Sequence, residues 1–175
     1  MSIMIVTAAF MAVSLLIFLL LVFKNDKYMS NRTTDFLARF SKLGIENNIS
    51  FSSQEILNDC AIGLDGKHRK LVVLKQCGQF EYDWHIINLD EVLSCFIKKT
   101  YRGIKAGELK KRGIDNYLES IILRLEFLDH RTPIEISFYE HAVHKGRKVL
   151  ELDRKAKNWQ IMLSKMIRNQ LQMIA

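Results

Sequence analysis

The chain has 175 residues, with 26 Lys and Arg against 19 Asp and Glu, which gives a formal net charge of +7 and a pI near 9.4. Its three cysteines, Cys60, Cys77 and Cys95, are odd in number and lack CxxC spacing, which argues against a disulfide framework and for reduced thiols. The positive charge raises nucleic acid as a partner. The sequence has no helix-turn-helix, zinc module or aromatic-basic repeat, so nucleic-acid binding is not expected.

The first 23 residues contain no charged side chain, and residues 3–23 are almost entirely apolar. About 20 apolar residues are enough to cross a hydrocarbon core of about 30 Å. The alternative is a cleaved signal peptide, which has a basic start, a shorter apolar core and small residues at the cleavage site. Here the core is longer and ends in bulky residues. The pattern therefore predicts a retained transmembrane helix over residues 1–23, which contacts the bilayer through residues 3–23.

The flanks of this apolar segment differ in charge. The basic residues lie on its C-terminal side, at Lys24, Lys27, Arg32, Arg39 and Lys42. The N-terminal side has no Lys or Arg. By the positive-inside rule, we expect the N-terminus outside the cell and the rest of the chain in the cytoplasm, as in a single-pass protein of the cell membrane.

Residues 24–44 are predicted to form a juxtamembrane link followed by a short amphipathic helix. Thr33, Thr34 and Asp35 offer an N-cap, apolar residues then follow at helical spacing, and Gly44 is expected to end the helix. Two interpretations stay open for its apolar face. The helix could lie in the lipid headgroup region, or it could pack against the domain that follows.

From residue 45 to about residue 139, the pattern changes to the alternation typical of strands. Strands are predicted over residues 60–64, 70–75, 84–89, 92–99, 123–127 and 134–139, with one more at 49–52. Asp65-Gly66 between two apolar runs indicates a hairpin, and the segment ending at Pro133, the only proline, indicates another. Six or seven short, mostly consecutive strands indicate a meandering antiparallel sheet or a small barrel.

Residues 151–174 return to helical spacing. The apolar positions are Leu152, Ala156, Trp159, Leu163, Met166 and Met173. The other faces carry too many charges for this helix to cross a bilayer, so we expect it to cap an open end of the barrel. The predicted fold is therefore α+β: one transmembrane helix, then a small antiparallel β-barrel or sheet, then a C-terminal amphipathic helix.

Four segments carry a family resemblance: the AIGLDGKHRKLVVL hairpin, the WHIINLDEVLSCFI unit, the LRLEFL and IEISFY strands, and the helix that contains Trp159. Together they resemble a pleckstrin-homology-like (PH-like) domain, in particular the bacterial form found behind transmembrane anchors. The resemblance covers residues 45–174 and departs from a compact domain in the long stretch 100–117. It implies a PH-like domain over residues 45–175, with the helix tryptophan packed into the barrel.

Basic residues cluster in this long stretch. They are Lys98, Lys99, Arg102, Lys105, Lys110, Lys111 and Arg112. Beside an anionic leaflet, each Lys or Arg can contribute about 1 kcal/mol of attraction, so the loop over residues 98–112 is a candidate lipid-facing segment. The alternative is a solvated loop whose charge aids solubility. The short basic turn at residues 67–70 is a weaker candidate, suggested by the lipid-binding members of the family.

Aromatic residues offer a second candidate surface. Phe80 and Tyr82 lie in a predicted connection, where together with Trp84 they could form an exposed patch for a protein partner. Trp84, Phe127, Phe138 and Trp159 otherwise fall on predicted core faces. Trp84 is thus expected in the core, and its place in a patch is the alternative.

No enzyme signature is present: the sequence has no GxSxG elbow, Walker loop or GxGxxG. Glu140, His141 and His144 could suggest a metal, but their spacing is not that of HExxH, and solvated turn histidines are the preferred interpretation. We therefore expect no catalysis, cofactor or metal. The predicted function is a membrane-tethered protein-binding or assembly module at the inner leaflet. The alternative is direct binding of anionic phospholipid headgroups through residues 98–112.

Overall fold

The computed structural model describes residues 34–57, 59–78, 81–103, 117–144 and 149–174. The chain divides into two compact units, residues 1–48 and 49–175. The transmembrane helix predicted over residues 1–23 and the link that follows it lie outside the described residues. Within the described ranges, no helix is both long enough and apolar enough to cross a bilayer.

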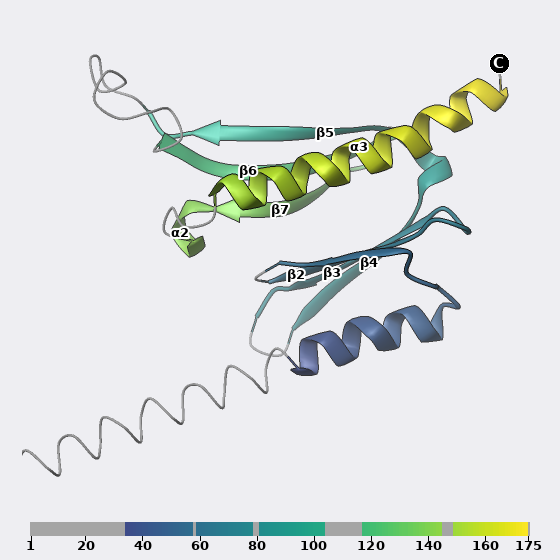
Figure 1. Cartoon of the computed structure of the whole chain (residues 1–175), viewed down its shortest axis with the longest axis horizontal. Coiled ribbons are helices and arrows are strands. Elements are labelled where there is room, and N and C mark those ends of the chain that lie inside the picture. Colours follow the sequence, from purple (N-terminus) through teal and green to yellow (C-terminus); the bar gives the residue numbers. More distant parts are fainter. Residues whose placement is uncertain (1–33, 58, 79–80, 104–116, 145–148, 175) are drawn as a thin grey trace, which may run out of the picture. The chain divides into compact units, whose positions relative to one another are not determined.

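The described part of the first unit is a helix over residues 34–46, drawn in blue in Figure 1. Phe36 and Phe40 are buried one turn apart, as the apolar spacing predicts. Leu37 is exposed, so the buried stripe is narrower than the sequence indicates. On the opposite side, Arg39 Nε lies 2.9 Å from Asp35 Oδ2.

The prediction that this helix ends at Gly44 is wrong. The helix continues to residue 46, and both the backbone N–H and the side-chain amide of Asn47 donate to the Leu43 carbonyl, at 3.2 and 2.9 Å. Asn48 then adopts a left-handed conformation with φ of 53°. Asparagine tolerates this conformation, and here it ends the helix in the way usually left to glycine.

The second unit begins with a four-stranded sheet in the order β1-β2-β3-β4. The strands are β1 (Ser53–Ile56), β2 (Cys60–Asp65), β3 (Lys70–Gln76) and β4 (Tyr82–Asn88). Every neighbouring pair is antiparallel and joined by a hairpin, which confirms the predicted meander. All six residues of the central strand β2 are buried.

The strand predicted at residues 49–52 is wrong, because β1 starts at Ser53. The segment before β1 instead closes over the end of β2. Ser50 N–H donates to Asp65 Oδ2, and the Ser52 hydroxyl and N–H both donate to the Leu64 carbonyl. These contacts satisfy the backbone without a ladder of strand hydrogen bonds.

A second sheet of three antiparallel strands follows in the order β5-β6-β7. Its strands are β5 (Val92–Tyr101), β6 (Leu118–Phe127) and β7 (Ile134–Glu140), and a short 3₁₀ helix, η1 (Leu89–Glu91), connects β4 to β5. The prediction for β6 began too late, at residue 123. Register shifts interrupt both pairings of this sheet, near Ser94, Tyr101 and Ile122.

The chain ends in two helices, α2 (His141–His144) and α3 (Val149–Ile174). Figure 1 shows α3, in yellow-green, running along the three-stranded sheet, and α3 contacts all three of its strands. The predicted C-terminal amphipathic helix is thereby confirmed to within two residues at its start. The described part of this unit is α+β, with seven antiparallel strands in two sheets packed against a C-terminal helix.

One hydrophobic core joins the two sheets and α3. Alternate residues of the strands contribute to it, among them Ile62, Leu71, Leu123 and Phe138, all fully or almost fully buried. The contribution of α3 is Leu152, Ala156, Trp159, Leu163 and Ile167. Each large apolar side chain buried in this way stabilises the fold by about 1.5–3 kcal/mol. Phe127, Phe138 and Trp159 therefore lie where the sequence predicts.

Ion pairs and a hydrogen bond also connect α3 to both sheets. Lys155 Nζ lies 3.0 Å from Glu55 Oε1 of β1, and Lys99 Nζ of β5 lies 2.7 Å from Asp153 Oδ1. Arg69, at the end of the β2–β3 turn, donates from Nη2 to the Met166 carbonyl at 3.1 Å. The position of the helix is thus set by directional contacts as well as by apolar burial.

Candidate functional site

The structure separates the members of the predicted basic surface. The described members are Lys98 and Lys99, near the end of β5, and Arg102, just after it. Lys105, Lys110, Lys111 and Arg112 lie outside the described residues, as does Phe80 of the predicted aromatic patch. The described part of the chain therefore contains only the first residues of the predicted loop.

Lys98 and Lys99 point to opposite faces of the three-stranded sheet. Lys98 Nζ lies 3.8 Å from Glu135 Oε1 on the outer face, where Arg124 also pairs with Glu135 at 2.9 Å. Lys99 lies on the face covered by α3 and pairs with Asp153. Both lysines thus have carboxylate partners within the domain.

Asp153 is held between two lysines. Burial alone would raise the pKa of its carboxyl group, but hydrogen bonds from Lys157 and Lys99 outweigh burial and hold that pKa below its ordinary value. The same bond raises the pKa of Lys157. Asp153 is therefore ionised at neutral pH, and it neutralises charge that the sequence would assign to the lipid-facing loop.

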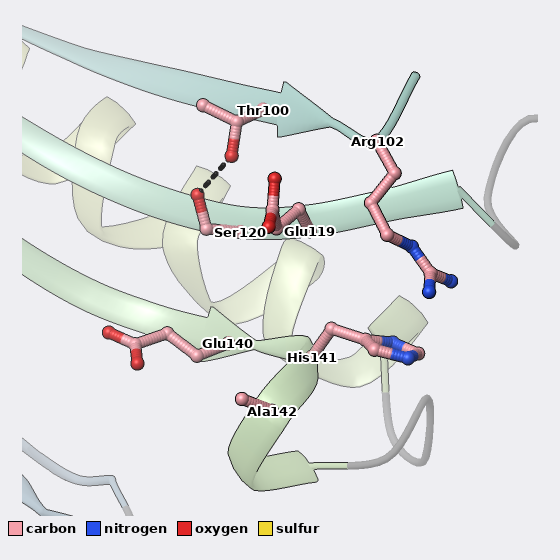
Figure 2. A pocket seen from close by; sticks show the side chains of 7 residues that line it. All are labelled: Thr100, Arg102, Glu119, Ser120, Glu140, His141 and Ala142. Carbon is pink, nitrogen blue, oxygen red and sulfur yellow. Dashed lines mark hydrogen bonds between the residues drawn. The ribbon is translucent and has the colours of Figure 1, made fainter. Parts of the chain in front are cut away.

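Arg102 lies in a pocket of about 370 Å³ at the end of the three-stranded sheet (Figure 2). The lining residues are Thr100, Arg102, Glu119, Ser120, Glu140, His141 and Ala142. The Thr100 and Ser120 hydroxyl groups hydrogen-bond across β5 and β6. Figure 2 shows the Arg102 and His141 side chains at one end of the pocket and Glu140 directed away from them.

The chemistry of this pocket is that of a polar ligand site with mixed charge. A guanidinium and an imidazole can bind an anionic oxygen, and the hydroxyl pair has one O–H donor left beyond its own hydrogen bond. His141 Nδ1 lies 3.1 Å from the Tyr139 hydroxyl group, which fixes the orientation of the ring. The sequence does not predict the pocket, because Thr100 and Ser120 become neighbours only through the β5–β6 register.

A second hollow, of about 480 Å³, lies along α3. It is lined by Asn158, Ile161, Met162, Lys165 and Met166. Ile161 is 54% exposed, although it is a large aliphatic residue. Met162 and Met166 are half-buried against the core and present part of their surface to the hollow. The hollow therefore offers apolar surface with a polar and basic rim.

The aromatic patch is present in part. Trp84 is 51% exposed, so the prediction that it lies in the core is wrong. It falls on the face of β4 opposite the buried Ile87, because side chains alternate along a strand. Tyr82 is half-buried on the same face. β4 is also an edge strand of its sheet, so no further strand covers its outer side.

The basic turn between β2 and β3 has a structural role. Arg69, with φ of 55°, places Nε 2.6 Å from Asp90 Oδ1 and also reaches the Met166 carbonyl of α3. His68 pairs with the buried Asp65. His68 and Arg69, two of the four basic residues of this turn, therefore make contacts within the domain.

The three cysteines differ in exposure. Burial raises the pKa of the Cys60 and Cys95 thiols to about 12, and only Cys77 is exposed. No group of His, Cys, Asp and Glu suited to a metal ion occurs among the described side chains. Comparisons with protein-family models, curated proteins and solved structures find no match for this chain.

Proposed function

We propose that this chain is a non-enzymatic, single-pass protein of a bacterial inner membrane, with its N-terminus outside and a PH-like domain in the cytoplasm. The domain serves as a protein-binding or assembly module at the inner leaflet. The proposed anchor rests on the apolar residues 3–23 and on the basic residues that follow them.

The PH-like assignment is supported by the order of elements. Four antiparallel strands, three antiparallel strands and one C-terminal helix follow each other along the chain. Trp159, in the middle of α3, is 4% exposed and belongs to the core shared by both sheets. This is the placement that the resemblance implies for the helix tryptophan.

The observation that carries the binding proposal is the apolar hollow on α3. Exposed aliphatic surface beside two methionines is suited to a protein partner, because methionine side chains adapt to the shape of an incoming apolar group. Lys165 and Asn158 at the rim supply polar contacts. A partner helix or loop that places an apolar side chain against Ile161 fits this surface.

Site-specific photo-crosslinking in native membranes tests the proposal. A photoreactive residue at position 161 of the full chain is expected to give a discrete adduct with a protein. The same residue at Leu128, an exposed aliphatic position on the β6–β7 turn, is the matched control. Adducts of equal yield at both positions, or an adduct at position 128 only, would contradict the proposal.

Binding of anionic headgroups is the second candidate, and the pocket at Arg102 favours it. Arg102 and His141 lie together at one end of this pocket, where the basic stretch 98–112 begins. We expect the full chain in liposomes to bind a soluble headgroup analogue such as inositol phosphate more weakly at high salt. Substitution of Arg102 by Gln, or of Lys110, Lys111 and Arg112 together, should then abolish binding. Binding that all these variants retain would exclude this candidate.

A further inference from the structure

The edges of the two sheets differ in how well they are protected. Among the described residues the edge strands are β1, β4, β5 and β7. β1 has only four residues, and register shifts interrupt the pairings of β5 and β7 with β6. The Cys95 carbonyl of β5 also accepts a hydrogen bond from the Ser164 hydroxyl of α3, at 3.5 Å. β4 has none of these protections.

β4 is a regular strand of seven residues, Tyr82–Asn88, and its pairing with β3 has no register shift. It contains no proline and no lysine, the residues that usually protect an edge. One face of the strand carries Trp84, which is 51% exposed, and the half-buried Ile86. An edge of this kind is competent to pair with another strand.

The hydrogen bonds at the two ends of the β3–β4 hairpin decide which backbone groups face the open edge. Leu89 N–H donates to the Arg69 carbonyl at 2.9 Å, and Cys77 N–H donates to the Glu81 carbonyl at 2.9 Å. In an antiparallel pair, hydrogen-bonded and non-hydrogen-bonded residue pairs alternate. The odd-numbered residues of β4 therefore bond to β3, and the N–H and C=O groups of Trp84 and Ile86 point away from it.

We infer that the β4 edge pairs with β4 of a second copy of this chain, antiparallel and in the register that places His85 opposite His85. In this register, Trp84 of each copy faces Ile86 of the other as a hydrogen-bonded pair, so the outward backbone groups of both residues are satisfied. Trp84 is then covered by an aliphatic side chain across the strands, a favourable pairing. The inference is independent of the partner proposed for α3.

The other face of the paired strands carries His85 and Asp83. His85 Nε2 lies 3.3 Å from Asp83 Oδ2 within one chain. In the paired strands, each His85 would also lie diagonally next to Asp83 of the second copy. A shift of the register by two residues would replace the Trp84–Ile86 pairs by a Trp84–Trp84 pair or an Ile86–Ile86 pair.

Disulfide trapping tests the register. In the full chain with the exposed Cys77→Ser background, His85→Cys places two thiols at a non-hydrogen-bonded pair, where Cα atoms lie about 4.5 Å apart and a disulfide can form. Oxidation in membranes should give a covalent dimer. Asp83→Cys is the matched control, on the same face, because its two thiols would be offset by about 13 Å along the strands. Equal crosslinking of both variants, or none of His85→Cys, would overturn the inference.

A proline scan tests the same edge without cysteine. Ile86→Pro removes an N–H that points away from β3, so the hairpin keeps its ladder while the edge is blocked. Gln54→Pro blocks the opposite edge of the same sheet in the same way, and it is the control. In detergent, light scattering should show a dimer for the native chain and for Gln54→Pro, and a dissociation constant about tenfold or more higher for Ile86→Pro. A monomeric native chain, or an Ile86→Pro dimer of unchanged stability, would contradict the inference.

Discussion

The imidazole of His68 donates from Nδ1 to Asp65 Oδ2 at 2.8 Å, and this contact closes the β2–β3 turn over a carboxylate that is inaccessible to solvent. Asp65 Oδ1 accepts from the backbone N–H groups of Lys67 and His68, and Oδ2 also accepts from Ser50. Both carboxylate oxygens are thus occupied, so one buried acid connects the turn to the segment that leads into β1.

Replacing Asp65 by Asn should destabilise the domain, because an amide has one acceptor oxygen and cannot serve the donors on both sides. We expect a clearly lower Tm by circular dichroism. Asp129→Asn is the matched control, since Asp129 is exposed and uses one oxygen to accept from Arg131 N–H. Equal Tm values for the two variants would show that Asp65 does not hold the turn.

The same carboxylate should make the free energy of unfolding fall at acid pH. Hydrogen bonds from the His68 side chain and backbone hold the pKa of Asp65 well below its ordinary value of 3.8. A depressed pKa contributes stability that is fully present above about pH 4 and lost as the pH falls further. In urea titrations, the native chain and Asp65→Asn should therefore differ most at pH 6–7 and converge towards pH 2–3. A difference that stays constant over this range would contradict the assignment.

Lys98 and Lys99 are adjacent in sequence but should differ in their effect on stability. Lys99→Met breaks the pair with the largely buried Asp153 and should cost about 1.5–3 kcal/mol of unfolding free energy. Lys98→Met breaks only the exposed 3.8 Å contact with Glu135 and should cost less than about 1 kcal/mol. Both variants lose one charge, so a comparison of urea midpoints separates structure from net charge. Equal costs would refute the α3–β5 connection.

The two tryptophans should report their different environments. Trp84→Phe leaves Trp159 as the sole indole, and its fluorescence should be blue-shifted and poorly quenched by acrylamide, because Trp159 is buried. Trp159→Phe, made in the Ile86→Pro background where the β4 edge is unpaired, leaves the exposed Trp84, which should be quenched readily. Trp159→Ala should also cost about 3–5 kcal/mol by opening a cavity in the core. Similar quenching of both indoles would contradict the fold.

Thiol labelling checks the cysteines. At pH 8 in the native protein, Cys77 should react with a maleimide or a disulfide reagent, whereas Cys60 and Cys95 should not, because burial raises their thiol pKa to about 12. All three should react in denaturant. Rapid native labelling of Cys95 would show that β5 is not covered by α3.

Much of the fold could be read from local patterns. Alternation in β7 and the spacing of Leu152, Ala156 and Leu163 by four and seven residues in α3 each follow from which face is buried. Asp65 marks the β2–β3 turn, because its carboxylate accepts from the N–H groups of the turn. The end of the first helix at residue 46 and the start of β1 at Ser53 were missed. Both boundaries depend on single side-chain hydrogen bonds, from Asn47 and Ser52. Such bonds leave little signal in a pattern of apolar and polar residues.

The sequence by itself determined the order and type of the elements and the apolar character of residues 3–23, because burial periodicity is a local property of the chain. Only the tertiary structure decided that Lys99 and Arg69 are used internally, that Trp84 lies on an exposed edge, and that Arg102 and His141 share one pocket. These relationships join residues far apart in sequence. Strand register and the packing of α3 bring them together, and no local pattern encodes either.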